Sequence, residues 1–433
     1  MKTNLFLAAA LVFISLHSFA QGGWTLCNAP AFGNRVDDIF MVDTQIGYAV
    51  SGDGKIVKTI DGGDNWITVR NDSVYHRSVE FINAQKGFVG GLTHSNQNNI
   101  LLRTLDGGAS WTDLTPQLDS VARKGICGLS IPDSNTIYGC GNWFQDSAYI
   151  VKSMDGGNTW SFIDMHTYAA HLIDMHFINK DTGFATGSGL PPSFEAIILY
   201  TMDGGQTWAY KFQDTLVLAW DGYCWKIQHL TDQVYYASIE GWTSFGRILK
   251  STDGGMTWNI ITVPPPAMGG NGIQGVGFID SLNGWTGGGW SHAFETHDGG
   301  ITWDTIQTCW SLNRIFKVND TLVFASGDRI WRHGASATGI APVAMMLQKA
   351  SINCYPNPAN NKMAIEMVLN VKTHARITLH DEIGKRIKLI DNSDKSKGVY
   401  RYDINTENLR SGTYYVILKT HSDDQAVKVV IVH

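Results

Sequence analysis

The sequence predicts an all-β protein, a seven-bladed β-propeller followed by a small C-terminal β-sandwich, and three observations support this fold class. One eight-residue phrase occurs six times, at intervals of 45 to 50 residues. A short apolar strand flanked by Gly or Ala occurs seven times. The final stretch, residues 351–433, has none of the 15 Trp of the chain and alternates apolar runs with turns. A period of this length is typical of propellers and solenoids.

The first 20 residues predict a secretory signal peptide. Lys2 precedes an apolar run from Leu5 to Leu16, and a small residue, Ala20, comes directly before Gln21. The run of about a dozen residues is shorter than the roughly 20 needed to span a bilayer. We therefore expect cleavage after Ala20, export through the periplasm, and no transmembrane segment in the mature chain.

The repeated phrase, [ST]-x-D-G-G-x-[STN]-W, predicts a tight turn. Its Asp can accept hydrogen bonds from backbone N–H groups, and its two Gly residues can take positive φ. The Trp then covers the hairpin as a large apolar plate. We interpret the phrase as structural and not as an active site. Its aspartates are Asp61, Asp106, Asp155, Asp203, Asp253 and Asp298.

Each repeat contains four short strands, A to D, with the phrase at the C to D hairpin, as in a propeller blade. The second strand occurs once more than the phrase, which gives seven units. The seventh, from Arg314 to His333, lacks a fourth strand, whereas Trp24-Thr25-Leu26 is similar to the start of the D strands. We predict that the N-terminal segment supplies the outer strand of the last blade, which leaves the ring no free edge. The propeller is expected to span residues 21–334.

The phrase resembles the Asp-box, or BNR, repeat of sialidases, sortilin and xyloglucanases. Its pairing with the motif [IVA]-G-[YFW]-[AV]-x-G is most similar to the photosystem II assembly factor family of seven-bladed propellers. The resemblance covers about residues 24–334 and involves turn and core residues, so it implies a fold and not a function. The photosystem role of that family belongs to photosynthetic membranes and is not carried over.

The sequence pattern changes after a linker, residues 335–350. The segments Tyr355-Pro356-Asn357-Pro358 and Leu409 to Tyr415, together with a basic and apolar tail, resemble the C-terminal sorting domain of type IX secretion substrates. For residues 351–433 the resemblance implies binding to the type IX machinery, passage across the outer membrane, and removal of the domain on or after export. The protein is then secreted or held at the outer cell surface. An accessory sandwich that only binds is the alternative.

The formal net charge of −6 excludes a generally basic protein that wraps nucleic acid. Binding residues are therefore sought on the B to C and D to A loops, on the face opposite the repeated turns. Aromatic side chains on such loops can stack on sugars or hold peptide side chains. Packing of the loops against one another is the alternative. The predicted binding set is Trp143, Phe144, Phe194, Trp220, Trp242, Phe245, Trp290 and His292.

These residues favour a non-catalytic binding module for a glycan, peptide or protein. The alternative is a glycoside hydrolase that uses the loop carboxylates Glu195, Glu240 and Asp221, since such enzymes need a carboxylate pair. The chain lacks the [FY]-R-I-P phrase of sialidases. No Cys/His spacing matches a metal site, and we expect no cofactor.

The cysteines offer one local prediction. If Ile131 opposes Thr136 in the third blade, Cys127 faces Cys140 and a cross-strand disulfide is possible. Cys27 and Cys309 form a weaker candidate pair near the ring seam.

Overall fold

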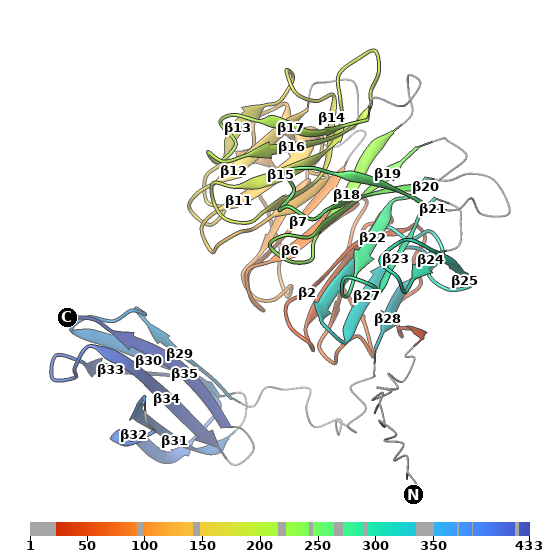
Figure 1. Ribbon diagram of the computed structural model, residues 1–433. Helices are drawn as coiled ribbons and strands as arrows, with labels where there is room; N and C mark the ends of the chain where they lie inside the picture. Colours follow the sequence, from red (N-terminus) through yellow and green to blue (C-terminus); the bar gives the residue numbers. More distant parts are fainter. Residues whose placement is uncertain are drawn as a thin grey trace, which may run out of the picture. The chain divides into compact units, whose positions relative to one another are not determined.

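The computed structural model describes residues 23–92, 98–141, 148–214, 222–241, 246–263, 272–289, 293–334, 350–369, 372–382, 384–420 and 424–433. They belong to two compact units, residues 1–337 and 338–433, which we describe separately (Figure 1). The expected signal peptide and most of the expected linker lie outside the described residues.

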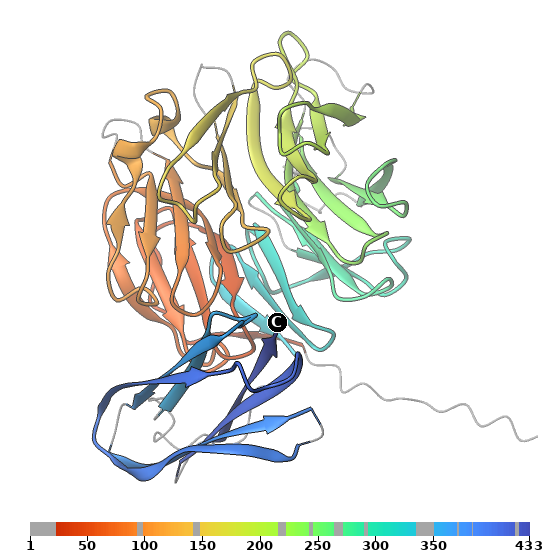
Figure 2. The same cartoon turned by 90° about the vertical axis from the view of Figure 1, so that its left-hand side faces the viewer.

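The first unit consists of seven four-stranded antiparallel sheets, the blades of a β-propeller. The colours of the ribbon follow the chain from blade to blade around the ring (Figure 2). The first blade consists of β2(Val36–Met41), β3(Gly47–Ser51), β4(Lys55–Thr59) and β5(Ile67–Asn71). The second consists of β6(Tyr75–Phe81), β7(Gly87–Leu92), β8(Leu101–Thr104) and β9(Thr112–Asp113). The third consists of β10(Gly128–Ser130), β11(Ile137–Gly141), β12(Tyr149–Ser153) and β13(Ser161–Asp164). The fourth blade consists of β14(His171–Phe177), β15(Gly183–Ser188), β16(Ala196–Thr201) and β17(Ala209–Gln213). The fifth consists of β18(Tyr223–His229), β19(Tyr235–Glu240), β20(Gly246–Ser251) and β21(Asn259–Val263). The sixth consists of β22(Gly275–Phe278), β23(Gly284–Gly287), β24(Ala293–Thr296) and β25(Asp304–Ile306).

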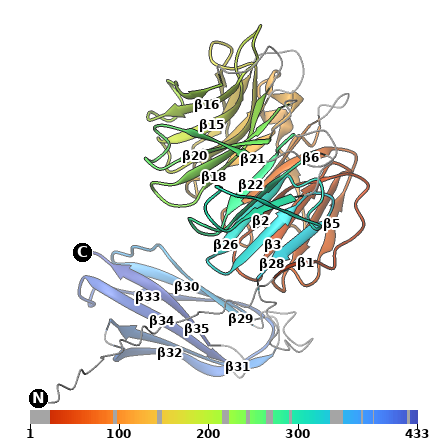
Figure 3. The same ribbon diagram turned by 45° about the vertical axis from the view of Figure 1, so that its right-hand side comes forward.

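The seventh blade combines the two ends of the unit. Its strands are β26(Arg314–Asn319), β27(Leu322–Ser326), β28(Ile330–His333) and β1(Trp24–Leu26). Strand β1 pairs antiparallel with β28, with Trp24 opposite His333 and Leu26 opposite Trp331 (Figure 3). The prediction that the N-terminal segment closes the ring is confirmed. The Trp24 ring also packs edge-on against Trp285 of the sixth blade, with ring centroids 5.2 Å apart.

Each Asp-box folds as a turn held by its own side chains. In the first blade, the Thr59 hydroxyl donates a hydrogen bond to Asp61 at 2.9 Å and accepts one from the Gly63 N–H at 3.0 Å. The Asn65 N–H donates to the same carboxylate at 2.9 Å. Gly62 and Gly63 have φ of 69° and 86°, a conformation that favours glycine.

The same bonds recur at the other five Asp-boxes, whose aspartates are Asp106, Asp155, Asp203, Asp253 and Asp298. The Trp that ends each phrase packs edge-on against an aromatic ring, as Trp66 does against Phe324 with centroids 6.3 Å apart. The Asp-box therefore joins a hairpin to the core.

The second unit is a β-sandwich of a three-stranded and a four-stranded sheet. Its strands are β29(Ala350–Tyr355), β30(Lys362–Leu369), β31(Thr373–Asp381), β32(Arg386–Lys395), β33(Gly398–Asn405), β34(Gly412–Thr420) and β35(Asp424–Ile431). Ile365 and Met367 of one sheet and Ile377, Val416 and Leu418 of the other contribute buried side chains to a single core.

The Tyr355 to Pro358 motif is attached to the last strand of the sandwich. The Asn357 side chain donates to the Lys428 carbonyl at 2.8 Å and accepts from the Val430 N–H at 2.9 Å. Ala359 continues this pairing through backbone bonds with Val430 and Val432. The motif therefore holds the segment between β29 and β30 against β35 by hydrogen bonds.

The structure contradicts the predicted cysteine pairing. Gly128, and not Cys127, lies opposite Cys140, and the Cys127 N–H donates to the Cys140 carbonyl at 2.7 Å. The Asp133 side chain accepts hydrogen bonds from the N–H groups of Asn135 and Thr136, at 2.8 Å each, which keeps Thr136 in the turn. This extra turn residue shifts the register by one. None of the six cysteines, all of them in the described residues, forms a disulfide, so the weaker pair of Cys27 and Cys309 is also wrong.

Candidate functional site

Most of the predicted aromatic set lies outside the described residues. These residues are Trp143, Phe144, Trp220, Trp242, Phe245, Trp290 and His292. Phe194 is described, on the loop between β15 and β16, and has a positive φ of 49°. Its ring centroid is 6.1 Å from that of His171, which in turn meets Tyr223 of the next blade at 5.6 Å. Phe194 therefore packs at the rim between the fourth and fifth blades.

The predicted carboxylates belong to separate networks. Glu195 accepts hydrogen bonds from Ser193 and, at 3.3 Å, from Gln213, all within its own blade. Glu240 accepts from Gln274 at 2.5 Å, and burial raises the pKa of its carboxyl group. The two carboxylates therefore have different hydrogen-bond partners, and Asp221 lies outside the described residues.

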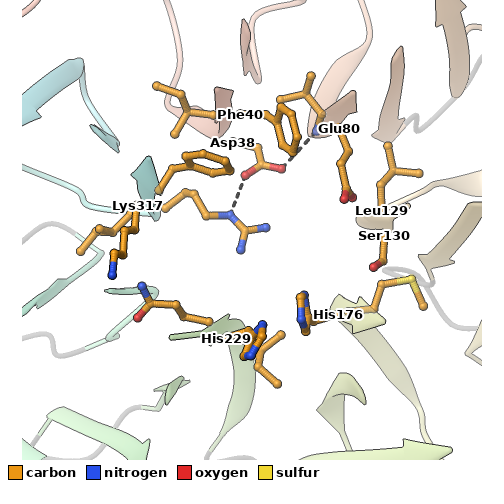
Figure 4. A pocket seen from close by; sticks show the side chains of 16 residues that line it. Asp38, Phe40, Glu80, Leu129, Ser130, His176, His229 and Lys317 are labelled. Carbon is orange, nitrogen blue, oxygen red and sulfur yellow. Dashed lines mark hydrogen bonds and ion pairs between the residues drawn. The ribbon is translucent and has the colours of Figure 1, made fainter. Parts of the chain in front are cut away.

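The channel along the ring axis holds a cavity of about 200 Å³. Side chains of six inner strands line it (Figure 4). The lining residues lie mainly toward the ends of these strands, where each strand enters its A to B turn. The Gly62 N–H of the first Asp-box donates to Gln45 in such a turn at 2.9 Å, so the Asp-boxes and the A to B turns share a face. The cavity is thus at the opposite end of the channel from the loops that carry the predicted set.

An ion network crosses this channel. Arg314 of the seventh blade donates to Asp38 of the first at 2.7 Å (Figure 4). It also donates to both carboxylate oxygens of Asp174 of the fourth blade, at 3.0 Å each. Burial opposes these charges, but Arg314 holds the pKa of Asp174 below its usual value, with a further contribution from Lys226. Because paired charges in a buried bidentate geometry fix one another's position, the network sets the shape of the channel.

The inner strands are also joined by a relay of side chains. A polar side chain on each of five blades accepts the backbone N–H of the next blade, at 2.7 to 3.2 Å. The pairs are Asp38 with Val79, Glu80 with Ile131, Ser130 with Phe177, Asp174 with Ile227, and Gln228 with Phe278. The sequence prediction did not include these residues. They occupy two positions of the repeat: Glu80, Ser130 and Gln228 lie opposite Phe88, Tyr138 and Tyr236 of the second strands, whereas Asp38 and Asp174 lie two residues earlier, opposite Val50 and Thr186. The available signal was that each is a polar residue of an inner strand.

Three titratable side chains of the cavity are shifted by burial. Burial raises the pKa of Glu80 to about 8 and lowers the pKa of His176 to about 4. It also lowers the pKa of His229, whose ring lies 5.1 Å from that of His176. At neutral pH both imidazoles are therefore neutral and the Glu80 carboxyl group is mostly protonated.

A second cluster fills the channel nearer the B to C loops. Asp37 accepts hydrogen bonds from Arg35 and Arg77, both at 2.6 Å, and Arg77 lies over the Trp225 ring at 4.6 Å from its centroid. The Trp225 indole N–H donates to Asn313 at 2.7 Å. Side chains of the first, second, fifth and seventh blades are thereby packed together.

The described residues contain no group of three or more His, Cys, Asp and Glu side chains able to hold a metal ion. Within the same ranges, no helix is long and apolar enough to cross a membrane.

Comparison with known proteins defines a class for the chain. Residues 353–433 match the family model described as the secretion system C-terminal sorting domain. The chain is therefore a type IX secretion substrate that carries a β-propeller, destined for the cell surface or the exterior. No curated protein matches the chain.

The propeller resembles YCF48 in structure. YCF48 from Cyanidioschyzon merolae is 18% identical with a TM-score of 0.54, and the match covers 72% of this chain and 98% of that chain. A structure of YCF48 bound to a D1 peptide gives 18% identity, a TM-score of 0.53, and coverage of 72% and 97%. The WD40 propeller domain of Doa1 is 12% identical, with a TM-score of 0.50 and coverage of 72% and 96%. At these identities the likeness concerns the fold alone.

Proposed function

We propose that the protein is a non-catalytic binding module, exported by type IX secretion, whose propeller holds a peptide segment of a partner protein. The observation that carries this proposal is the axial cavity, which is lined by charged, polar and aromatic side chains of six blades. Its volume of about 200 Å³ lies below the 300 to 1,000 Å³ of typical small-molecule pockets. A single peptide side chain is a better match for this volume than a sugar chain.

Two further points support a binding role. The ion network and the relay hold the inner strands rigidly, and a rigid site loses little conformational entropy when a ligand binds. YCF48, a propeller of similar fold, has been solved with a peptide bound. The predicted loop aromatics remain candidates for contacts with the rest of a partner.

The test is to probe the purified protein with peptide and glycan arrays. We expect peptides to bind without being cleaved. Glycan turnover that Glu195→Gln or Glu240→Gln abolishes would instead establish the hydrolase alternative. Binding of glycans alone, without peptides, would contradict the peptide proposal.

We further propose that the signal peptide, residues 1–20, and the sorting domain, residues 351–433, are both removed during export. In a type IX-competent host, the mass of the mature propeller then corresponds to a chain that starts at Gln21 and ends in the 335–350 linker. A reporter fused to residues 335–433 should leave the periplasm of that host. Retention of the reporter in the periplasm would refute this assignment.

A further inference from the structure

We propose that the axial cavity binds a primary ammonium group, carried by a lysine side chain or by a free alkylamine. This inference rests on the proposed binding function and names the chemistry that the cavity recognises. Hydrogen-bond acceptors, aromatic rings and the buried Glu80 carboxyl group line this cavity.

The acceptors come from three blades. The Glu80 carboxyl group is directed into the cavity, and its Oε1 accepts the Ile131 N–H at 3.2 Å (Figure 4). The Nε2 atoms of His176 and His229 are buried without a hydrogen-bond partner among the described residues. The His229 Nε2 lies 3.8 Å from the Asp232 carboxylate. An ammonium group has three N–H donors to offer such a set.

Aromatic rings supply the apolar wall. Phe40 and Phe316, from the first and seventh blades, lie with ring centroids 5.1 Å apart and both line the cavity. A methylene chain can pack on these rings, and an ammonium group near their faces gains cation–π attraction.

The charge balance favours a cation over an anion. Asp38 and Asp174 face two cations, Arg314 and the buried Lys226, so these four charges cancel. At the cavity mouth, the Lys317 ammonium lies 2.8 Å from the Asp320 carboxylate. Glu80 is held by the Ile131 N–H and shares with Asp38 and Asp174 the charge of Arg314, which acts on it through space. An arriving ammonium group would stabilise its ionised form, and Glu80 would release its proton to solvent.

The probe for the experiment is n-butylamine, which has the shape of a lysine side chain, and n-butanol is its neutral control. Binding to the full-length protein is followed by ligand-detected NMR. We expect butylamine to bind and butanol to bind at least about tenfold more weakly, since hydrogen bonds to a charged group are worth about 1.4 kcal/mol or more.

The variants are Glu80→Gln and Asp304→Asn. Glu80→Gln keeps an acceptor for the Ile131 N–H and should weaken butylamine binding about tenfold or more. Asp304→Asn replaces a carboxyl group by an amide at an exposed position of the outer strand β25, outside the cavity. This control variant should bind butylamine with the affinity of the wild-type protein. Equal affinity of wild type and Glu80→Gln, or equal binding of butanol and butylamine, would overturn the inference. A melting temperature within a few degrees of wild type excludes misfolding as the cause of lost binding.

The pH dependence is an independent readout. Asp38, Asp174 and Arg314 act electrostatically on Glu80, and His176, His229 and Lys317 line the same cavity. The buried Lys226 acts on Asp38 and Asp174. Because Glu80 must ionise, butylamine should bind more tightly at pH 9 than at pH 6 in wild type. This gain should disappear in Glu80→Gln; a gain that persists in this variant would contradict the role of Glu80.

A blocked peptide with one lysine, compared with its acetyl-lysine counterpart, identifies the source of the ammonium group. If both peptides fail and butylamine binds, the ligand is a free amine and the peptide function is wrong. If peptides bind equally to wild type and Glu80→Gln, the peptide function stands and this inference fails.

Discussion

Arg314 and Asp174 face each other across the propeller axis and share two hydrogen bonds of 3.0 Å, although 140 residues separate them in the chain. Since Arg314 also binds Asp38 of the first blade, one guanidinium group links three blades. The pair therefore couples the stability of the ring to the shape of its channel.

Arg314→Met should destabilise the propeller by about 3 kcal/mol or more, because it leaves Asp38 and Asp174 as unpaired buried charges. Denaturant unfolding followed by Trp fluorescence measures this, since all 15 Trp lie within residues 24–331. Arg329→Met is the matched control at an exposed position and should change stability little. Similar losses in the two variants would contradict the role of the network.

Deletion of residues 21–30 should lower the melting temperature of the propeller by about 10 °C. It removes the outer strand of the last blade and exposes the edge of β28. Thr25→Ala, which keeps the backbone ladder, should unfold close to the wild-type temperature. An unchanged melting temperature of the deletion variant would show that ring closure by β1 does not stabilise the propeller.

The Asp-boxes predict a specific loss of stability in acid. Hydrogen bonds from Thr207 and Thr201 lower the pKa of Asp203 to about 2, against about 3.9 in an unfolded chain. A lowered folded-state pKa contributes stability above pH 4 that is lost as the pH falls from about 4 to about 2. Asp203→Asn should therefore melt a few degrees below wild type at pH 6, and the gap should shrink by pH 2. A gap that is constant with pH would contradict this mechanism.

The cysteines should be free thiols with low reactivity. Burial raises the pKa of Cys27 to about 12 and of Cys354 to about 11, so few thiolates form at pH 8. Iodoacetamide should label the folded protein slowly, and the unfolded, unreduced protein should gain six labels by mass. A gain of four or fewer without reductant would reveal a disulfide.

Part of the candidate site could have been read from the sequence. Asp38, Glu80, Ser130, Asp174 and Gln228 are polar residues of the first strand of their repeats, which is the inner strand of a propeller blade, although they occupy two different positions of the repeat. The sequence cannot show that Arg314 selects Asp174 over other acids, because that choice depends on which blades face each other across the ring. Nor does the sequence show the register of Cys127, which depends on two hydrogen bonds from backbone N–H groups to the Asp133 side chain.

By itself the sequence determined the seven repeats, the Asp-box turns, the closing strand and the sorting domain, because local hydrogen bonds and strand periodicity repeat along the chain. It directed attention to loop aromatics on one face. Only the tertiary structure placed Glu80, His176, Phe40 and Phe316 around one cavity at the other end of the channel. The reason is physical: those side chains are 40 to 276 residues apart in sequence, and only closure of the ring brings them together.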